Sequence, residues 1–299
     1  MRKVFTECML DLTNKYDTFF LTGDLGFMAL EEVREAYGDR FVNVGVAEQN
    51  MIGVAAGLSK LGNTVFAYSI APFCYARPFE QVRNDLSFSK LPVCLVGNGG
   101  GYGYGYMGPT HHALEDCSVM SSINLKVLIP AFDQDVKAIL SQPVSTTTYL
   151  RLGYDDSPND FIPPDYKSWR KIFSGSLGVM AVLGPLVGNA IRVLKDLPES
   201  ERPSLWVVCE FDATIAPPEL WTEISAKPLV VFEEHVRSGG LGSLIALECV
   251  NQGSTPSQFI HHYAQGYPSK RYGSQKFHRK ECQLDEKSMQ IVIQGLVNA

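Results

Sequence analysis

The first half of the chain alternates short apolar runs with longer amphipathic stretches. The apolar runs have the length and composition of buried strands, and we expect strands at 19–22, 41–44, 65–68, 92–96, 126–129 and 147–150. The stretches between them have helical periodicity, and we expect helices at 2–14, 28–37, 48–61, 73–88, 113–122 and 132–141. This alternation predicts an α/β fold with a doubly wound parallel sheet, whose ligands bind beyond the carboxyl ends of the strands.

A segment rich in proline, aspartate and turn formers follows this unit, so we expect a first domain at 1–155 and a linker at 156–170. The remainder, 171–299, alternates again and predicts a second doubly wound α/β domain. Its expected strands lie near 178–183, 205–209, 229–232 and 258–262, and its expected helices near 187–197 and 240–250.

Composition narrows the possible partners. The 299 residues are 45% hydrophobic, enough for two cores, and the net charge of −6 disfavours nucleic acid and anionic membranes as partners. No apolar run approaches the roughly 20 residues of a membrane span, and Glu7 interrupts the start where a signal peptide is apolar, so we expect a cytoplasmic protein. The seven cysteines are scattered without metal-site spacing, which predicts reduced thiols. The charged fraction of 19% is low and indicates a surface covered by another chain.

The glycine-rich segment 97–108 contains one formal Gly-x-Gly-x-x-Gly pattern, at Gly103, Gly105 and Gly108. It does not fit a dinucleotide fingerprint, because the preceding strand ends near Val96 and Pro109 follows where a helix should open. The segment is then either a loop whose backbone approaches a ligand closely or a plain connection. The entropic cost of so many glycines favours the ligand loop.

Three polar side chains are candidates for chemistry. His111 ends the glycine-rich segment, where an imidazole can bond to a substrate or move protons. The run His111-His112-x-x-Glu115-Asp116 could indicate a metal, but adjacent side chains on an extended segment diverge, so we expect no metal site. Glu48 opens an apolar helix and Asp24 follows a strand; each either caps a local element or contacts a ligand.

Several segments together resemble the pyrimidine-binding half of thiamine-diphosphate enzymes, and most closely transketolases. They are 22–25, 41–50, 80–83 and 108–112, and the segments 230–235 and 239–243 are similar to the family's carboxyl-terminal domain. Members of the family bind the diphosphate and magnesium through a Gly-Asp-Gly motif, which this sequence does not contain. The resemblance therefore implies the carboxyl-terminal subunit of a split transketolase. An amino-terminal partner subunit would supply the Mg²⁺ ligands, and this chain would form a homodimer core within a heterotetramer.

The resemblance also implies roles for individual residues. Glu48 would hydrogen-bond the pyrimidine of thiamine diphosphate and so promote its activation, and Phe73 would stack on that ring beside Ile70. Asp24 and Leu25 would lie near the rest of the cofactor. His111 would bond to a hydroxyl of a sugar substrate and help to move protons.

Two departures from the family concern the substrate. Met107 stands where transketolases carry an aspartate that reads a substrate hydroxyl, and Gly99 stands where they carry a phosphate-contacting histidine. Arg2 and Arg151 remain as candidate anion contacts. A thioether cannot accept a hydrogen bond of comparable strength, so we expect a modified, deoxygenated or nucleotide-linked sugar, or another aldehyde or 2-oxo compound.

Two alternatives remain at the level of the sequence. A 2-oxo acid dehydrogenase beta-type subunit has the same domain order, although the Gly-Pro-Thr-His element at 108–111 favours transketolase. A non-catalytic paralogue that acts as a structural subunit is the other, and the presence of Glu48 and His111 counts against it.

Overall fold

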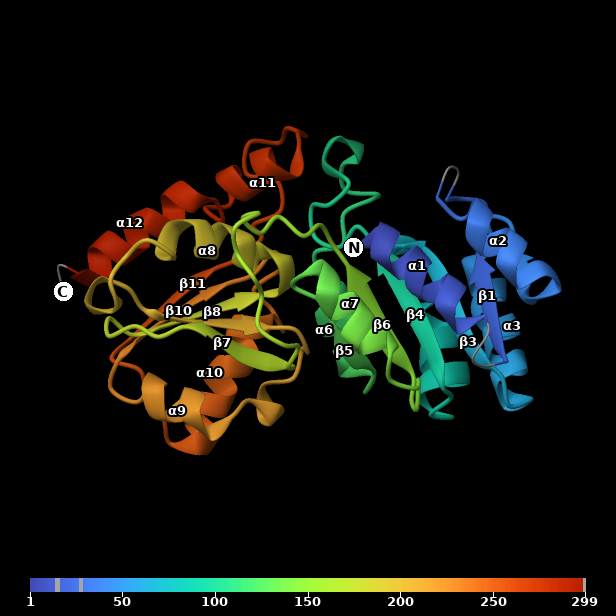
Figure 1. Ribbon diagram of the computed structural model, residues 1–299, viewed down its shortest axis with the longest axis horizontal. Coiled ribbons are helices and arrows are strands. Elements are labelled where there is room, and N and C mark those ends of the chain that lie inside the picture. The colour runs from blue at the N-terminus through green and yellow to red at the C-terminus, as the bar shows by residue number, and fades with distance from the viewer. Residues whose placement is uncertain (14–16, 27–28, 298–299) are drawn as a thin grey trace.

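The computed structural model describes residues 1–13, 17–26 and 29–297, which form two bodies that are each built around one sheet (Figure 1). The first sheet has the order β2-β1-β3-β4-β6-β5 and all its strands are parallel. The strands are β1 Thr18–Thr22, β2 Phe41–Asn43, β3 Thr64–Ile70, β4 Val93–Asn98, β5 Lys126–Leu128 and β6 Thr148–Leu152. The predicted parallel sheet is confirmed, with small shifts at the strand ends.

Helices cover both faces of this sheet. One face carries α1 (Arg2–Leu12), α2 (Glu31–Tyr37) and α7 (Asp133–Leu140), and the other carries α3 (Glu48–Lys60), α4 (Ala71–Tyr75) and α6 (Asp116–Ser122). Successive strand residues point to opposite cores, so Phe20 packs beneath the first set and Leu21 beneath the second. Residues 14 and 28, which the predicted helices included, lie outside the described residues.

Three predicted helices of the first body were wrong in extent. The helix expected at 28–37 begins only at Glu31. The segment 73–88 is not one helix but α4, α5 (Phe79–Gln81) and a π-helical turn, η2 (Val82–Ser87). Pro78 separates α4 from α5, because proline has no N–H to donate and its ring clashes with the preceding turn. The helix expected from 113 begins only at Asp116, since Ala113 pairs with Gly101 in an isolated antiparallel bridge.

The second sheet has the order β11-β10-β8-β9-β7. Its strands are β7 Trp169–Phe173, β8 Val179–Leu183, β9 Ser204–Val208, β10 Pro228–Phe232 and β11 Gln258–His262. The four predicted strands are confirmed, whereas β7 was not predicted. It pairs antiparallel with β9 at the edge of the sheet and begins inside the expected linker.

Helices also cover both faces of the second sheet (Figure 1). The helices α8 (Val187–Leu194) and α12 (Glu286–Val297) lie on one face, and α9 (Pro218–Ile224) and α10 (Leu241–Gln252) on the other. Of these, α8 is shorter than predicted, and α9, α12 and α11 (Gln275–Glu281) were not predicted. None of the helices in the described residues has the length and apolar character needed to cross a lipid bilayer.

The two bodies meet along the end of β5. Ile129 N donates to Cys209 O at 2.7 Å, and Phe211 N donates to Val127 O at 2.9 Å. Arg170 of β7 forms an ion pair with Asp135 of α7 at 2.6 Å. These contacts hold the second body against the carboxyl edge of the first sheet, where the site residues lie.

Candidate functional site

The carboxyl end of β1 forms a tight turn against the end of β2. Asp24 N donates to Gly45 O at 3.3 Å, and Asn43 Nδ2 lies 3.5 Å from Asp24 Oδ1. A methyl group at Gly23 would lie only 3.2 Å from Gly45 O, so the close approach of the two segments favours glycine. The turn leaves Asp24 exposed at the edge of the sheet where doubly wound folds bind ligands.

A pocket of about 450 Å³ opens beside this turn. The Thr22 hydroxyl is buried and has no hydrogen-bond partner among the described residues. The pocket therefore offers an unused polar group beside two predicted cofactor contacts. Its lining includes Thr22, Asp24, Leu25, Leu30, Arg34 and Asn43.

Glu48 is the first residue of α3 and is only 5% exposed. Within the part of the chain that the structure describes, no backbone N–H of α3 donates to its carboxylate. Oε1 instead accepts a hydrogen bond from Arg77 Nη1 at 2.9 Å. A methyl group at Gly23 would lie 3.9 Å from this same oxygen, so Glu48 adjoins the β1 turn. Of the two predicted roles, this geometry favours ligand contact over capping.

Arg77 joins Glu48 to an aromatic face. Its guanidinium carbon lies 3.7 Å from the centre of the Phe73 ring, and the ring of His111 meets Phe73 edge-on with centres 5.2 Å apart. Ile70, the half-buried last residue of β3, directly precedes the helix that carries Phe73. A carboxylate, a guanidinium, an aromatic ring and an imidazole thus form one continuous cluster.

His111 is half-buried, and its Nδ1 lies 2.9 Å from Thr110 Oγ1. Among the residues that the structure describes, none bonds to its Nε2. One ring nitrogen is thus held by a neighbour while the other is available to a substrate, which suits hydrogen bonding or proton transfer.

Arg77 and Tyr104 are site residues that were not predicted. Arg77 follows Phe73 by four positions, the spacing that places two side chains on one side of a helical turn, and this is the signal that could have identified it. The ring of Tyr104 lies 5.8 Å from that of His111, and its hydroxyl accepts a hydrogen bond from Asn98 Nδ2 at 2.8 Å. Burial raises the pKa of Tyr104, with the Asn98 hydrogen bond acting in the opposite direction, so the phenol stays protonated and can donate.

The Tyr104 ring also explains Gly99. This glycine has φ = 72°, and a Cβ at that position would overlap the Tyr104 ring. The space expected for a phosphate-contacting histidine is therefore filled by a tyrosine from the same loop. Met107 ends the short turn Gly105–Met107 and is 57% exposed, so it lies at the surface of the loop.

Arg151 is not part of this cluster. Its side chain is buried, its Nε lies 3.0 Å from Asp116 Oδ2, and its Nη2 donates to Ala113 O at 2.8 Å and Glu234 O at 3.0 Å. Burial acts to lower the pKa of Arg151, but Asp116, Cys117, Tyr149 and Glu234 together outweigh it and the net direction is upward. The guanidinium is thus a charged connection between the two bodies.

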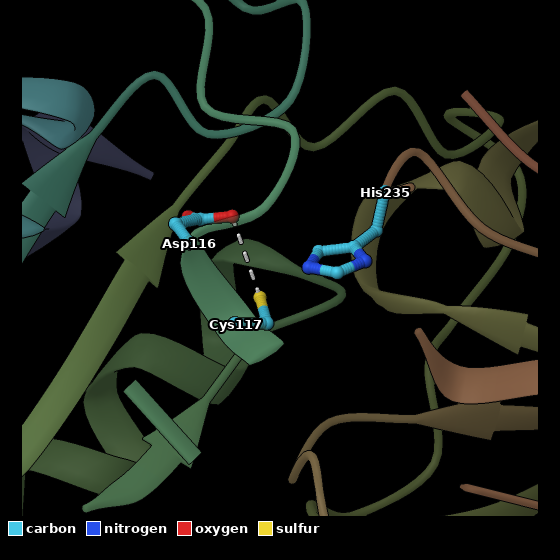
Figure 2. Close-up of side chains that lie close together, drawn as sticks. All are labelled: Asp116, Cys117 and His235. Carbon is cyan, nitrogen blue, oxygen red and sulfur yellow. Dashed lines mark hydrogen bonds between the residues drawn. The ribbon is translucent and has the colours of Figure 1, made fainter. Parts of the chain in front are cut away.

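Asp116, Cys117 and His235 bring three metal-ligand types within 4.8 Å of one another (Figure 2). Each is already engaged inside the protein. Asp116 Oδ2 accepts a hydrogen bond from Tyr149 OH at 2.8 Å in addition to the Arg151 pair, and His235 Nε2 accepts from Ser118 N at 3.3 Å. Burial raises the pKa of the Cys117 thiol, and the Asp116 carboxylate adds to the rise. A protonated thiol and a charge-paired carboxylate favour packing between the bodies over metal binding.

Comparisons with known proteins identify the family of the chain. Residues 1–153 match the family described as transketolase, pyrimidine binding domain. An apulose-4-phosphate transketolase subunit of Phocaeicola vulgatus is 28% identical over 272 residues, which cover 87% of this chain and 86% of that protein. The protein of the same name from Actinobacillus succinogenes is 30% identical over 223 residues, or 70% of each. A solved structure described as a split gene transketolase, inactive beta4 tetramer, is similar with a TM-score of 0.83 at 25% identity, covering 99% of this chain and 98% of that one.

Proposed function

This chain belongs to the transketolase family, and from that premise we propose that it is the carboxyl-terminal subunit of a two-chain, thiamine-diphosphate-dependent enzyme of the cytoplasm. The proposed reaction transfers a two-carbon ketol unit from a ketose donor to an aldehyde or modified-sugar acceptor. The observation that carries this proposal is the continuous cluster of Glu48, Phe73 and His111 at the carboxyl edge of a parallel sheet.

The residues of the cluster fit an aminopyrimidine. Glu48 is a buried carboxyl with one oxygen bonded to Arg77, which leaves the other oxygen to bond to a ring nitrogen. Phe73 provides an aromatic face, and Ile70 precedes it at the edge of the sheet. When bound, thiamine diphosphate supplies the electron sink for cleaving the carbon–carbon bond of the donor. Asp24 and Leu25 line the adjoining pocket and would contact the remainder of the cofactor.

The polar groups of the loop would orient the substrate. His111, held by Thr110, would bond to a substrate hydroxyl and move a proton. The hydroxyl of Tyr104 offers a second donor close to it. Because Met107 replaces a hydroxyl-reading carboxylate, the acceptor in this proposal is a sugar that lacks or masks the corresponding hydroxyl.

The diphosphate and Mg²⁺ would be bound by the amino-terminal partner subunit. Mg²⁺ requires near-octahedral oxygen ligands, and the one candidate ligand group in the described ranges includes a thiol and an imidazole. The face of α3 would form a homodimer core, since Gly53 and Gly57 lie exposed one turn apart and permit close approach of a second helix. Two copies of each chain would then form a heterotetramer.

Calorimetric titration with thiamine diphosphate and Mg²⁺ tests the proposal. The chain is measured alone, with its amino-terminal partner, and as Glu48→Gln in the pair, with the exposed Glu201→Gln as the matched control. We expect tight binding only in the pair, and loss of ketose turnover in Glu48→Gln but not in Glu201→Gln.

Other outcomes would refute the proposal in distinct ways. Tight Mg²⁺-dependent binding by the lone chain would reveal a diphosphate site on this chain. Absence of binding in the pair would favour a non-catalytic structural subunit. Carbon dioxide release from a 2-oxo acid, without transfer to an aldehyde, would favour the 2-oxo acid dehydrogenase beta-type alternative.

A further inference from the structure

The loop that ends in His111 is anchored by residues from the carboxyl-terminal half of the chain. Tyr102 is fully buried, and its backbone N donates to Glu234 Oε1 at 2.6 Å. Its hydroxyl donates to Gly266 O at 2.7 Å. One residue of the loop is thus held at its backbone and at the tip of its side chain by segments far away in the sequence.

His112 provides a second anchor. Its Nε2 lies 2.8 Å from Gly105 O, and because a carbonyl can only accept, Nε2 must carry the proton. In the neutral ring Nδ1 is then an acceptor, and Tyr267 OH donates to it at 2.7 Å. Both nitrogens are satisfied, so the tautomer and the orientation of the ring are determined by the loop on one side and by Tyr267 on the other.

Aromatic and charged groups of α11 complete the anchor. The ring of His278 stacks on Tyr102 with centres 4.7 Å apart and meets His112 edge-on at 5.0 Å. Glu234 is also bonded to Arg279 and accepts from Gln275 Nε2 at 2.8 Å. The carboxylate that receives the loop is therefore itself held by two side chains of one helix.

His111 lies one residue away but points elsewhere. His112 contacts Tyr267, whereas His111 contacts Phe73 and Tyr104. The backbone N of each histidine donates to Gly108 O, at 3.0 Å and 3.2 Å, so the two residues share one turn. His112 is held at both ring nitrogens, and the peptide unit between the two histidines is planar. The position of His112 therefore determines the position of the His111 backbone.

We propose that Tyr267 and Glu234 are positioning residues of the active site, which hold the 99–112 loop through His112 and Tyr102 and thereby direct His111 toward Phe73. The role of His111 in this inference rests on the proposed function, whereas the anchoring itself does not. Residues outside the pyrimidine-binding region would then control the geometry of substrate contact.

The hydrogen bond between His112 and Tyr267 joins two neutral side chains. Burial lowers the pKa of His112 to about 4, so the ring is neutral at physiological pH. The groups that face it are Gly105 O, His278, Glu234, His111, Tyr267 and Tyr102, whose ring meets that of His112 edge-on. Burial also raises the pKa of Tyr267 to about 12, so its hydroxyl remains a donor.

Replacement of Tyr267 by phenylalanine in the full chain tests this inference. Tyr263→Phe is the matched control, because the Tyr263 ring packs against His261. In Tyr267→Phe we expect amide hydrogen exchange over 99–112 to become about tenfold faster, the factor that corresponds to one ordinary hydrogen bond. The pKa of His112, measured by NMR, should rise because the neutral ring loses its donor, and the His111 ring signals should shift. In the assembled enzyme kcat/KM should fall about tenfold.

Two results would overturn the inference. One is unchanged loop exchange together with an unchanged His112 pKa. The other is faster loop exchange that leaves the His111 signals and the turnover at their wild-type values. A wild-type pair that shows slow loop exchange but no ketol transfer would overturn the proposed function alone, and the anchoring would stand.

Discussion

Arg170 and Asp135 form a buried ion pair between the two bodies, and the variant Arg170→Met tests how much it stabilises them. The side chains are 3% and 0% exposed, and Nη2 lies 2.6 Å from Oδ2. The same oxygen accepts from Ala131 N and Phe132 N, each at 3.0 Å. Methionine keeps much of the aliphatic volume of arginine but removes the charge.

The expected cost follows from the carboxylate that remains. Removal of one partner from a buried ion pair costs about 3–5 kcal/mol, because the other charge is left uncompensated. The two backbone donors still stabilise Asp135, whereas its Oδ1 has no partner among the described residues. We therefore expect Arg170→Met to lower the free energy of unfolding by ~3 kcal/mol, the lower end of that range. The double variant Asp135→Asn/Arg170→Met retains an acceptor for both backbone donors without a buried charge, and should lose only ~1 kcal/mol.

Urea unfolding measures this difference. All three tryptophans, Trp169, Trp206 and Trp221, lie in the second body, so their fluorescence follows that body while far-ultraviolet circular dichroism follows both. Wild-type transitions by the two probes should coincide, and those of Arg170→Met should separate at lower urea. The control Lys195→Met removes a surface ion pair with Asp160 and should leave both transitions in place. The reasoning would be refuted if the free energy of unfolding of Arg170→Met lay within ~1 kcal/mol of the wild-type value. It would also be refuted if the double variant were as unstable as Arg170→Met.

Three further predictions concern the loop. Because the pKa of His112 is lowered from 6.5 to about 4, the folded chain binds fewer protons than the unfolded chain in this range. Stability should therefore fall by ~3 kcal/mol as pH drops from 6.5 to 4, and an equal fall in His112→Gln would contradict this origin. Gly99→Ala should lower stability by ~2 kcal/mol in thermal unfolding, because its positive φ disfavours a side chain and the new methyl overlaps Tyr104; an unchanged midpoint would count against that overlap. Met107→Asp should raise kcat/KM about tenfold for a pentose phosphate with a free hydroxyl, and no gain would mean that position 107 does not face the substrate.

The sequence predicts the fold well where strands are buried on both faces. The centres of β3, β4, β8 and β9 are apolar runs because helices cover both sides of each sheet. The edge strand β7 was missed because Arg170 and Lys171 interrupt its apolar pattern, and Arg170 is buried only through its pairing with Asp135 on a distant helix. Pro78 in the sequence is enough to predict that the helix expected at 73–88 is interrupted there, whereas nothing in the sequence predicts the π-helical turn that follows.

For the site, the sequence identified residue types but not their partners. Glu48 and His111 were candidates from their positions in the sequence and Phe73 from the family resemblance, and the structure brings the three together. Arg77 was missed although its spacing from Phe73 was visible, because its pairing with Glu48, 29 positions earlier, arises only in the folded chain. Tyr104 was missed because the conformation of the glycine-rich loop, which brings its ring to Asn98 and His111, has no helical or strand periodicity to reveal it. For Arg151 the charge was visible in the sequence but the buried Asp116 that compensates it was not, and its contact with a substrate stays a prediction.

The anchoring of the 99–112 loop has a consequence for protein engineering. A chimaera that joins the first body of this protein to the second body of a relative would preserve each sheet, yet it would replace Glu234 and Tyr267 together with their surroundings. The crossover point would lie far from the cluster of Glu48, Phe73 and His111 and would still change the contacts that hold the loop. Recombination libraries in this family should therefore exchange the loop and its anchoring residues as one unit, even though about 130 positions separate them along the chain.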